Sequence, residues 1–542
     1  MALRKKWMAM LLIGVMVIAV ISGCASNTNN NSASTNNNTP AASNSTDTTP
    51  AVKEEEPAKP VEYVDIEVWT TNSGYREVTK GSPLYDFYKE KTGVGIIQPY
   101  VEWNGGTTYQ QQLNLKIAAN EMPDMFLPVN GMEYELAKNG ALLDLTDLLP
   151  EKAPRLWNLI PQDVWDVVRS YDPNGEGRIY SVPSILSFGR TGPMIRQDWL
   201  DTLNLSMPTT QEEFVNVLRA FRDKDPNQNG LKDELPTGGR EQARWMDYLF
   251  SMYGIAMHEG YPDWDIYNGE LTYSAVSPNM KDAIAFLRDL YKERLIDPET
   301  FLNSKSAWEG KVSSNQVGVF FYWVSSASGF LADIYESTGI KGDFSVLPQI
   351  DAPGYEGFTT MKRINSQQWV VKNTNDQAKI DSVMKLLDSY ADESQWIDMW
   401  MGVEGMHWET KDGLKVKMSE DKSVMQNLLL TPYYDIGTVQ FSKDLYADNP
   451  DPEWEWANSQ DIRNLVENQK YVKALAGDGL PAAVYSDYPD IQNRTLYVEY
   501  ITKIVLGDYD LDKFDEFVDR WYSSGGEAVT KAAREWYAKT QQ

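Results

Sequence analysis

The sequence is poor in cysteine, histidine and basic residues. Its 542 residues include one cysteine and two histidines, and 78 acidic residues outnumber 50 lysines and arginines, which gives a net charge of −28. A single cysteine excludes an intrachain disulfide, and two histidines leave little for a zinc site or a Ser-His catalytic triad. The acidic balance argues against a nucleic-acid partner, because such partners require basic surfaces. It also weakens, without excluding, the case for a polyanionic ligand.

Apolar residues are plentiful. They make up 42% of the chain and include 18 tryptophans, enough for a large core. A chain of this length is expected to form more than one lobe.

The most informative stretch is the loop 225–234. Six of its residues offer oxygen ligands, five through side chains and one through its backbone carbonyl: Asp225, Asn227, Asn229, Leu231 (the carbonyl), Asp233 and Glu234. Gly230 follows the third alternate position, where a sharp turn brings the chain around an ion. Calcium takes six to eight oxygens, which this spacing supplies. The loop predicts a structural calcium ion, and an Asx-rich surface turn is the alternative.

The calcium loop resembles an EF-hand only in its first half. It begins with the D-x-[DN]-x-[DN]-G pattern, but Pro236 stands at the twelfth position, where an EF-hand has its bidentate glutamate. A second stretch, 172–177, opens in a similar way but lacks a closing acidic pair. We interpret that stretch as a tight turn.

The N-terminus is typical of a lipoprotein leader. A basic start at 4–6 precedes an apolar run at 7–21, which is too short for a comfortable membrane span. The run ends in Ile-Ser-Gly-Cys, which resembles a bacterial lipobox and implies cleavage after residues 1–23 and a lipid on Cys24. An ordinary signal peptide with an incidental cysteine is the alternative. Residues 24–60 are rich in Asn, Ser, Thr, Pro and Ala, so we expect a disordered tether.

The folded body begins near Val61 and alternates strands with helices. Strands are expected at 64–69, 95–101 and 122–126, with helices at 84–91 and around Leu113 and Ile117. This order is typical of an α/β lobe with a largely parallel sheet. Further along, Thr209 or Thr210 can cap a helix through a capping box with Glu212 or Glu213, and that helix should end just before the calcium loop.

The order and spacing of several segments resemble one family. They include the lipobox, NGALLDLTDLL, IYSVPSILSFGRTGPMIRQDWLDTLNLSMPTTQEEF, the calcium loop, VLPQIDAPG and GVEGMHWE. Together they resemble the extracellular solute-binding proteins of ABC importers, which include maltose-binding protein, and most closely the large lipoprotein and alginate-oligosaccharide-binding members. The resemblance implies a two-lobed α/β fold, like that of periplasmic binding proteins, with a ligand cleft between the lobes. It also implies calcium bound at 225–234.

The resemblance places the lobes along the chain. We expect an N-terminal lobe at 61–183 and 370–435, and a C-terminal lobe with the calcium loop at 184–369 and 436–542. Sugars bind aromatic faces and planar polar groups, so the candidates are side chains after strands or at lobe crossings. They are Trp69, Trp103, Asn104, Phe188, Arg190, Trp245, Tyr322, Trp323, Trp408 and Trp454, with Glu102 and Trp456 as further possibilities. Packing in the core is the alternative for each aromatic, and least so for Trp323, which stands where family members stack a ligand.

The resemblance implies a lipid-anchored receptor on the extracellular face of the membrane. It would be a monomer that captures an oligosaccharide and delivers it to an ABC permease without catalysis. The negative net charge favours a neutral sugar. A secreted glycoside hydrolase is one alternative, which needs two carboxylates about 5–9.5 Å apart, and no pair stands out among 78 acidic residues. A surface adhesin is the other alternative, and it predicts no ligand-driven closure.

Overall fold

The structure is a computed structural model. It describes residues 62–70, 77–102, 107–129, 131–392, 394–395, 399, 402–411, 414–417, 433–434 and 455–541. The predicted leader, Cys24 and the tether lie outside these ranges. The described residues belong to one compact unit, Val61–Gln542. Among its described helices, none has the length and apolar character needed to cross a membrane.

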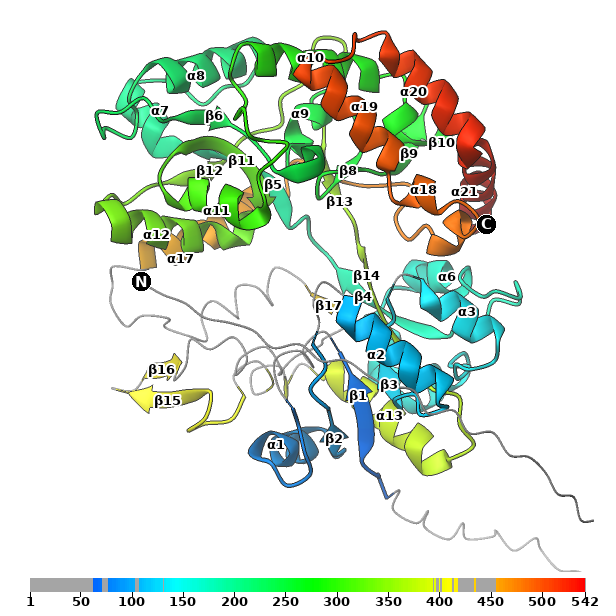
Figure 1. The fold of residues 1–542 in the computed structure, drawn as a ribbon. Helices are drawn as coiled ribbons and strands as arrows, with labels where there is room; N and C mark the ends of the chain where they lie inside the picture. The colour runs from blue at the N-terminus through cyan, green and yellow to red at the C-terminus, as the bar shows by residue number, and fades with distance from the viewer. Residues whose placement is uncertain are drawn as a thin grey trace, which may run out of the picture. The chain divides into compact units, whose positions relative to one another are not determined.

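A six-stranded sheet forms the first lobe (Figure 1). Its order is β17 (Tyr433–Tyr434), β4 (Ser181–Leu186), β14 (Ile364–Val371), β3 (Met125–Phe126), β1 (Ile66–Trp69) and β2 (Ile96–Ile97). β1 is parallel to β2 and β3, and β17 is parallel to β4, but β14 is antiparallel to both of its neighbours. The predicted largely parallel sheet is therefore a mixed one, because a strand from far along the chain inserts between β3 and β4.

The helices of the first lobe follow the predicted alternation. They are α1 (Pro83–Thr92), α2 (Thr107–Ala118), α3 (Met132–Lys138), α4 (Leu148–Lys152), α5 (Pro154–Leu159), α6 (Gln162–Arg169) and α13 (Gln377–Tyr390). The strand expected at 95–101 is reduced to two residues, with one further bridge between Gln98 and Val78. Buried side chains from α1, α6 and α13 join those of the sheet in one core.

A four-stranded sheet forms the second lobe. Its order is β12 (Phe344–Val346), β5 (Thr191–Arg196), β11 (Val317–Trp323) and β6 (Leu235–Thr237). β11 is antiparallel to β5 and parallel to β6. Short two-stranded pairs accompany this sheet and the C-terminal segments: β7 (Met257–His258) with β8 (Tyr261–Pro262), β9 (Trp264–Tyr267) with β10 (Glu270–Tyr273), and β13 (Thr359–Met361) with β18 (Val472–Ala474). A separate pair is formed by β15 (Trp408–Lys411) and β16 (Leu414–Lys417).

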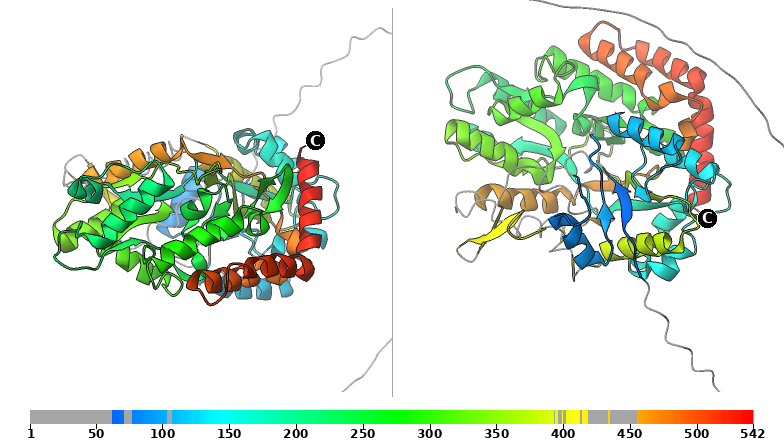
Figure 2. Two further views of the ribbon diagram at one scale, coloured as in Figure 1. Left: turned by 90° about the horizontal axis from the view of Figure 1, so that it is seen from above. Right: turned by 60° about the horizontal axis from the view of Figure 1, so that its bottom comes forward.

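Helices cover the second lobe. Those before β14 are α7 (Gln197–Leu203), α8 (Gln211–Asp223), α9 (Asp247–Ser251), α10 (Met280–Lys292), α11 (Lys305–Ser313) and α12 (Ala327–Thr338). Those near the C-terminus are α17 (Glu455–Asn468), α18 (Pro489–Gln492), α19 (Thr495–Leu506), α20 (Lys513–Trp521) and α21 (Glu527–Thr540). The late helices, drawn orange to red, lie against the green ones in every view, and α19 contacts α10 (Figures 1 and 2). Distant segments thus share one core.

The chain passes between the two sheets close to the expected crossings. β4 and β14 form one antiparallel ladder from Ser181↔Val370 to Ile185↔Ile364. Residues 184–186 and 364–369, which we expected in the second lobe, are therefore strand residues of the first sheet. The two strands stay paired until they reach the segments that lead to the second lobe, which are 187–190 after β4 and the residues just before 364 in front of β14.

The capping box predicted before the calcium loop is confirmed. Thr210 is the N-cap of α8, and its hydroxyl accepts a hydrogen bond from the Glu213 backbone N–H at 3.2 Å. The Glu213 carboxylate in turn accepts from the backbone N–H and the hydroxyl of Thr209, each at 2.9 Å. α8 ends at Asp223, directly before the loop.

Candidate functional site

Three segments of the second lobe converge at one edge of its sheet. Arg190 precedes β5, Trp323 ends β11, and Arg240 follows β6 after two glycines. β11 runs parallel to β6 and antiparallel to β5, with Trp323 opposite Thr191. The carboxyl ends of β11 and β6 therefore meet the amino end of β5, and this is the edge at which the chain enters from the first lobe. Ligands of open α/β sheets bind at such carboxyl ends.

Arg190, Glu259 and Trp323 form a polar cluster at this edge. The Arg190 guanidinium lies over the Trp323 ring, 4.9 Å from its centroid, and donates to Glu259 Oε1 at 2.6 Å. The Trp323 indole N–H donates to the same oxygen at 3.3 Å. Burial acts to raise the pKa of Glu259, but Arg190 holds it below its ordinary value. The cluster thus offers an aromatic ring and an ionised carboxylate side by side.

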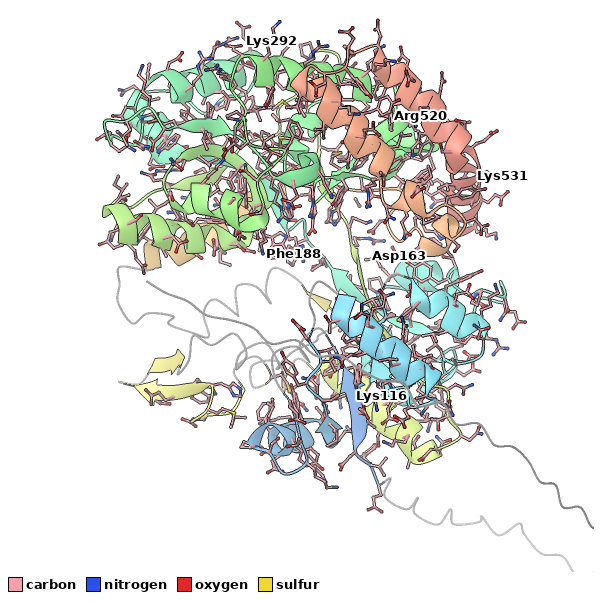
Figure 3. The ribbon with its side chains drawn as sticks, viewed as in Figure 1. Lys116, Asp163, Phe188, Lys292, Arg520 and Lys531 are labelled. Atoms are coloured by element: carbon pink, nitrogen blue, oxygen red, sulfur yellow. The ribbon has the colours of Figure 1, made fainter. Side chains whose placement is uncertain are left out.

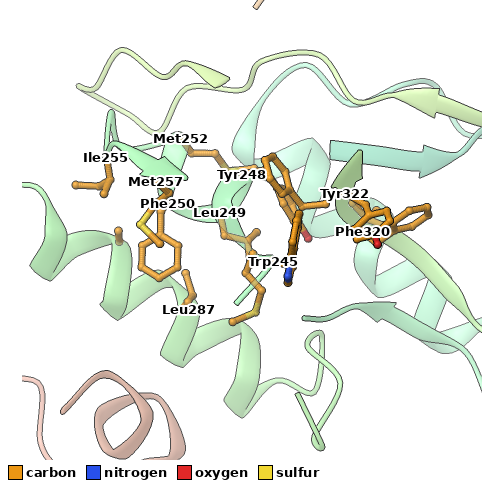
Figure 4. Close-up of a cluster of buried hydrophobic side chains, with 14 of the residues drawn as sticks. Trp245, Tyr248, Leu249, Phe250, Met252, Ile255, Met257, Leu287, Phe320 and Tyr322 are labelled. Atoms are coloured by element: carbon orange, nitrogen blue, oxygen red, sulfur yellow. The ribbon is translucent and has the colours of Figure 1, made fainter. Parts of the chain in front are cut away.

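Trp245 and Tyr322 extend this cluster into the protein interior. Tyr322 stacks on Trp323, with ring centroids 5.3 Å apart and planes inclined by 23°, and Trp245 lies 5.0 Å from Tyr322. Both side chains belong to the buried cluster shown in Figure 4. Trp245 and Tyr322 are only 3% and 7% exposed, so they support the partly buried Trp323 ring from beneath.

A tight turn beside Trp245 explains why glycine stands next to Glu259. Gly260 has φ +89° and packs on the backbone of Arg244, where a Cβ atom would lie 2.5 Å from Cα. Glu259 itself adopts a positive φ of 49°. This close approach joins the β7–β8 turn to the Arg240–Trp245 segment and sets the Glu259 carboxylate beside Arg190.

The remaining described candidates lie elsewhere. Trp69 is buried in the first lobe, where it contacts Tyr109 edge-on at 6.0 Å and donates to Glu67 at 2.6 Å. Phe188, labelled in Figure 3, is buried in the core of the second lobe. Trp408 donates to the Gly402 carbonyl at 3.0 Å, within the β15–β16 hairpin region.

Five further predicted ligand-binding residues lie outside the cluster or outside the described residues. Glu102 is exposed, and Trp456 packs 6.4 Å from Tyr335. Trp103, Asn104 and Trp454 lie outside the described residues. The structure therefore brings together four of the predicted residues: Arg190, Trp245, Tyr322 and Trp323.

Sequence reasoning missed Glu259, Arg240 and Arg244, which contact Trp245 or Trp323. It also missed Tyr261, which contacts Arg244. Two of these four residues stand in the stretch GREQARW, where two arginines follow β6 and flank a glutamate. That charge pattern after a strand was a usable signal. For Glu259 and Tyr261 the sequence gives only a weak signal, which is the turn glycine between them.

A buried aspartate, Asp247, and a partly buried histidine, His258, lie beneath the site, and their pKa values are shifted in opposite directions. Both oxygens of Asp247 accept from the Gly260 N–H at 2.7 Å, and burial raises the pKa of Asp247 to about 7. Burial lowers the pKa of His258 to about 4, and its buried Nδ1 has no hydrogen-bond partner among the described residues. The folded protein therefore keeps His258 neutral and readily takes a proton on Asp247.

The two groups make opposing contributions to the pH dependence of stability. Between pH 6.5 and about 4, the unfolded chain binds a proton at His258 that the folded protein does not, so stability falls on acidification. Between about pH 7 and 3.8, the folded protein binds an extra proton at Asp247, so stability rises on acidification. We expect His258→Gln to lack the first effect. Its free energy of unfolding, relative to that of the parent, should therefore rise by about 2 kcal/mol as the pH falls from 7 to 5. Melting temperatures of both proteins at the two pH values measure this, and an equal change in both would contradict it.

The calcium loop is held by hydrogen bonds among its own residues. The Asp225 carboxylate accepts from the backbone N–H groups of Asn229 at 3.1 Å and Gly230 at 2.9 Å. Asn229 Oδ1 accepts from the Leu231 N–H at 2.7 Å. Gln228 and Gly230 take positive φ values of 56° and 77°, which bends the chain back toward its start. The loop joins the end of α8 to the start of β6.

The last residue of this loop shows that the donor set fits a cation. Glu234 is 8% exposed, yet neither of its carboxylate oxygens has a hydrogen-bond partner in the described part of the chain. Burial, followed by the charges of Asp233 and Asp225, raises the pKa of Glu234. A buried carboxylate without a partner is costly unless a cation compensates it. Among the described residues no group of three or more His, Cys, Asp or Glu side chains gathers at metal-binding spacing, and the donor set here includes amides and a carbonyl.

A cavity of about 510 Å³ lies in the first lobe, at a different place. It is lined by charged residues of both signs that include Asp65, Glu67, Asp124, Lys372 and Lys379. The first four stand at or near the amino ends of β1 and β3 and the carboxyl end of β14, and Lys379 belongs to the first turn of α13. Since Lys379 donates to Asp124 at 2.7 Å, much of this charge is internally paired, and we assign no ligand there.

The chain was compared with protein families and known proteins. Residues 69–395 match the family model of the bacterial extracellular solute-binding protein. The chain is 24% identical to the lipoprotein LipO of Bacillus subtilis over 99% of both chains. It is 27% identical to the fructooligosaccharide ABC transporter substrate-binding protein FusA of Streptococcus pneumoniae, over 57% of this chain and 56% of FusA.

Solved structures share the fold. A calcium-free crystal structure of the alginate-binding protein AlgQ2 aligns with a TM-score of 0.63 at 20% identity, covering 88% of this chain and 98% of that one. An EF-hand mutant of S. pneumoniae FusA with fructo-nystose aligns with a TM-score of 0.63 at 19% identity, covering 88% and 99%. The two sheets and their crossings are thus those of a two-lobed α/β binding protein. The chain belongs to the bacterial extracellular solute-binding protein family.

Proposed function

We propose that this protein is the lipid-anchored substrate-binding component of an ABC importer and that it captures an oligosaccharide between its two lobes. The observation that carries the proposal is the Arg190–Glu259–Trp323 cluster at the carboxyl end of β11. An aromatic ring beside an ionised carboxylate suits a sugar, which presents apolar faces and hydroxyl donors. The names of FusA and AlgQ2, which bind saccharides, support this ligand class.

Capture of the sugar forms and breaks no covalent bond. Trp323 covers an apolar sugar face, and Glu259 accepts from hydroxyl groups. A ligand that contacts both lobes only when they are closed shifts the population toward the closed form. The closed form then docks on the permease subunits, which take up the intact sugar. The protein acts as a monomer and not as an enzyme.

Attachment to the membrane is assigned to Cys24. The lipobox at 21–24 and the lipoprotein relative LipO support a diacylglyceryl and palmitate anchor. One acyl chain alone binds membranes weakly, so several chains on one cysteine give stable retention. The tether at 24–60 then holds the binding domain at the extracellular face of the membrane.

Calcium is assigned to the loop 225–234 as a structural ion. Side-chain oxygens of Asp225, Asn227, Asn229, Asp233 and Glu234 and the Leu231 carbonyl would hold it. Asn227 Nδ2 donates to the Asn315 carbonyl at 3.2 Å, and Gln316 donates to Asp233 at 3.2 Å. The loop is therefore bonded to the turn before β11 while it leads into β6. An ion here would fix the starts of the two strands whose far ends carry Arg240 and Trp323.

A thermal-shift screen tests the proposed function. The unit 61–542, which forms one compact body, is melted with neutral and acidic oligosaccharides. A ligand at a hundredfold excess over its dissociation constant adds about 2.7 kcal/mol of stability. We expect one saccharide class to raise the melting temperature and to be recovered intact. Recovered fragments would support the hydrolase instead, and no shift with any saccharide would contradict the proposal.

Replacing Trp323 with alanine is expected to weaken binding of the saccharide found in that screen at least tenfold. The variant loses the aromatic face and the indole N–H at Glu259, and central aromatic contacts are worth about 2 kcal/mol or more. Titration calorimetry measures the affinity. Trp157→Ala is the matched control, because Trp157 stacks on Trp165 against the core of the first lobe, and it should bind normally. Unchanged affinity in Trp323→Ala would remove Trp323 from the site.

A further inference from the structure

The candidate site contains buried arginine nitrogens without partners. Four Nε atoms are buried with no hydrogen-bond acceptor in the described ranges, and they belong to Arg190, Arg240, Arg244 and Arg494. All four guanidinium groups lie over the rings of Trp245, Tyr261 or Trp323. A buried charged donor without an acceptor is costly. Four of them in one place indicate that an acceptor enters from outside.

Arg240 and Arg244 have only long-range ion pairs, although Arg244 also donates to the Glu259 backbone carbonyl at 3.5 Å. Both approach the same oxygen of Glu241 at 3.8 Å, which is too far for a hydrogen bond. Arg240 is 7% exposed. Burial, and then repulsion from Arg244, lowers the pKa of Arg240. Two guanidinium groups thus share one carboxylate.

The other acidic groups nearby are already engaged. Glu259 accepts from Arg190 and from the Trp323 indole. Asp263 accepts from Lys362 at 2.9 Å. Asp247 accepts from Gly260, and burial favours its neutral form. Glu309 also interacts electrostatically with Arg240, but it accepts from the Tyr322 hydroxyl at 3.2 Å and pairs with Lys305. Among the described residues, none of these carboxylates forms a hydrogen bond or an ion pair with Arg240.

Aromatic rings hold the arginines in fixed orientations. The guanidinium carbons of Arg244 and Arg494 lie 4.7 and 4.4 Å from the Tyr261 ring centroid. Tyr261 is itself fixed by a hydrogen bond from its hydroxyl to Gln242 at 2.7 Å. A stacked guanidinium keeps its N–H edge available for bidentate recognition of a planar carboxylate.

We propose that the ligand is an acidic oligosaccharide and that Arg240 and Arg244 bind the carboxylate of one of its uronic acid residues. The inference rests on the proposed function and adds the chemical class of the sugar. It departs from the neutral ligand that the net charge favours, because the local charge of the site decides binding within the Debye length of about 8–10 Å.

Matched pairs of sugars test the inference. Full-length protein in detergent solution is titrated by calorimetry with trigalacturonate against galactotriose, and with trimannuronate against mannotriose. At least one uronate should bind more than about tenfold tighter than its neutral counterpart, as expected for charge-assisted hydrogen bonds. Its affinity should also fall with added salt. Equal or tighter binding of the neutral sugars would overturn the inference and leave the proposed function intact. Binding of no saccharide would overturn both.

Arginine variants test where the carboxylate of the bound uronate lies. Arg244→Met should reduce uronate affinity by about 10- to 100-fold with little effect on any neutral sugar. Arg219→Met is the matched control, because this substitution removes the same charge outside the site. Arg219 pairs with Glu293 at 2.6 and 2.9 Å. If Arg244→Met fails to fold, Arg240→Met takes its place. Uronate affinity that is unchanged in a folded variant would contradict the assignment.

Discussion

Replacing Glu234 with glutamine is expected to abolish most of the thermal stabilisation that calcium gives this protein. The Glu234 carboxylate is buried and without a partner in the described structure, so its charge is available to a cation. Calcium at a hundredfold excess over its dissociation constant adds about 2.7 kcal/mol. The parent protein should therefore melt several degrees higher in calcium than in chelator. Glu234→Gln should melt at nearly the same temperature in both.

The second Asp-Pro-Asn loop supplies the control. Asp172 accepts from three backbone N–H groups, those of Asn174, Glu176 and Arg178, at 2.8 to 3.0 Å. This loop is the turn that its sequence predicts. Asp172→Asn should lower the melting temperature equally with and without calcium. If the parent protein were indifferent to a strong chelator, the calcium assignment would be contradicted.

Replacing Lys362 with methionine is expected to cost about 2–3 kcal/mol of stability, less than the loss of one partner of a fully buried ion pair, because this pair is partly exposed. Lys362 stands between β13 and β14, at the crossing that returns to the first sheet. Its ammonium donates to Asp263 at 2.9 Å, and the two side chains are 26% and 16% exposed. Asp478 also faces Lys362 electrostatically and accepts from the Arg363 N–H at 2.5 Å. The variant leaves these carboxylates without their cation.

Chemical denaturation measures this effect. The double variant Lys362→Met with Asp263→Asn should regain part of the loss, because it removes the uncompensated charge. Lys470→Met is the surface control, since Lys470 pairs with Glu467 in solvent, where such pairs contribute little. A Lys362→Met protein as stable as the parent would show that the pair does not hold the crossing.

Local patterns were predictable from the sequence. The turn at 225–234, whose calcium ion stays a prediction, and the α8 capping box each lie within a dozen or so consecutive residues, where spacing alone sets the geometry. The same holds for the turn at 172–177. The insertion of β14 between β3 and β4 was not predictable from periodicity, because it pairs residues 179 to 246 positions apart.

The candidate site was predictable only in part, for the same reason. Trp323 and Arg190 were found because they end a strand and a crossing. Glu259 was not, because its place beside Arg190 depends on the Gly260 turn packing on Arg244. Trp69 has the same sequence context as Trp323, the end of a strand, but Tyr109 and the surrounding core bury it. Tertiary packing therefore decides which aromatic faces a ligand.

One short strand connects the two sites of the second lobe. β6 has three residues, with Glu234 directly before it and the Gly238–Arg240 segment directly after it. The calcium loop thus lies at one end of β6, and Arg240 lies at the other. An ion that fixes the start of β6 also restricts the position of Arg240.

Small-angle X-ray scattering tests the central claim, capture by lobe closure, most directly. The unit 61–542 is measured alone and saturated with the saccharide that gives the largest thermal shift. A ligand bound between two lobes should reduce the radius of gyration, and Trp323→Ala at the same ligand concentration should show a smaller reduction. An unchanged radius of gyration at proven saturation would contradict closure around the ligand.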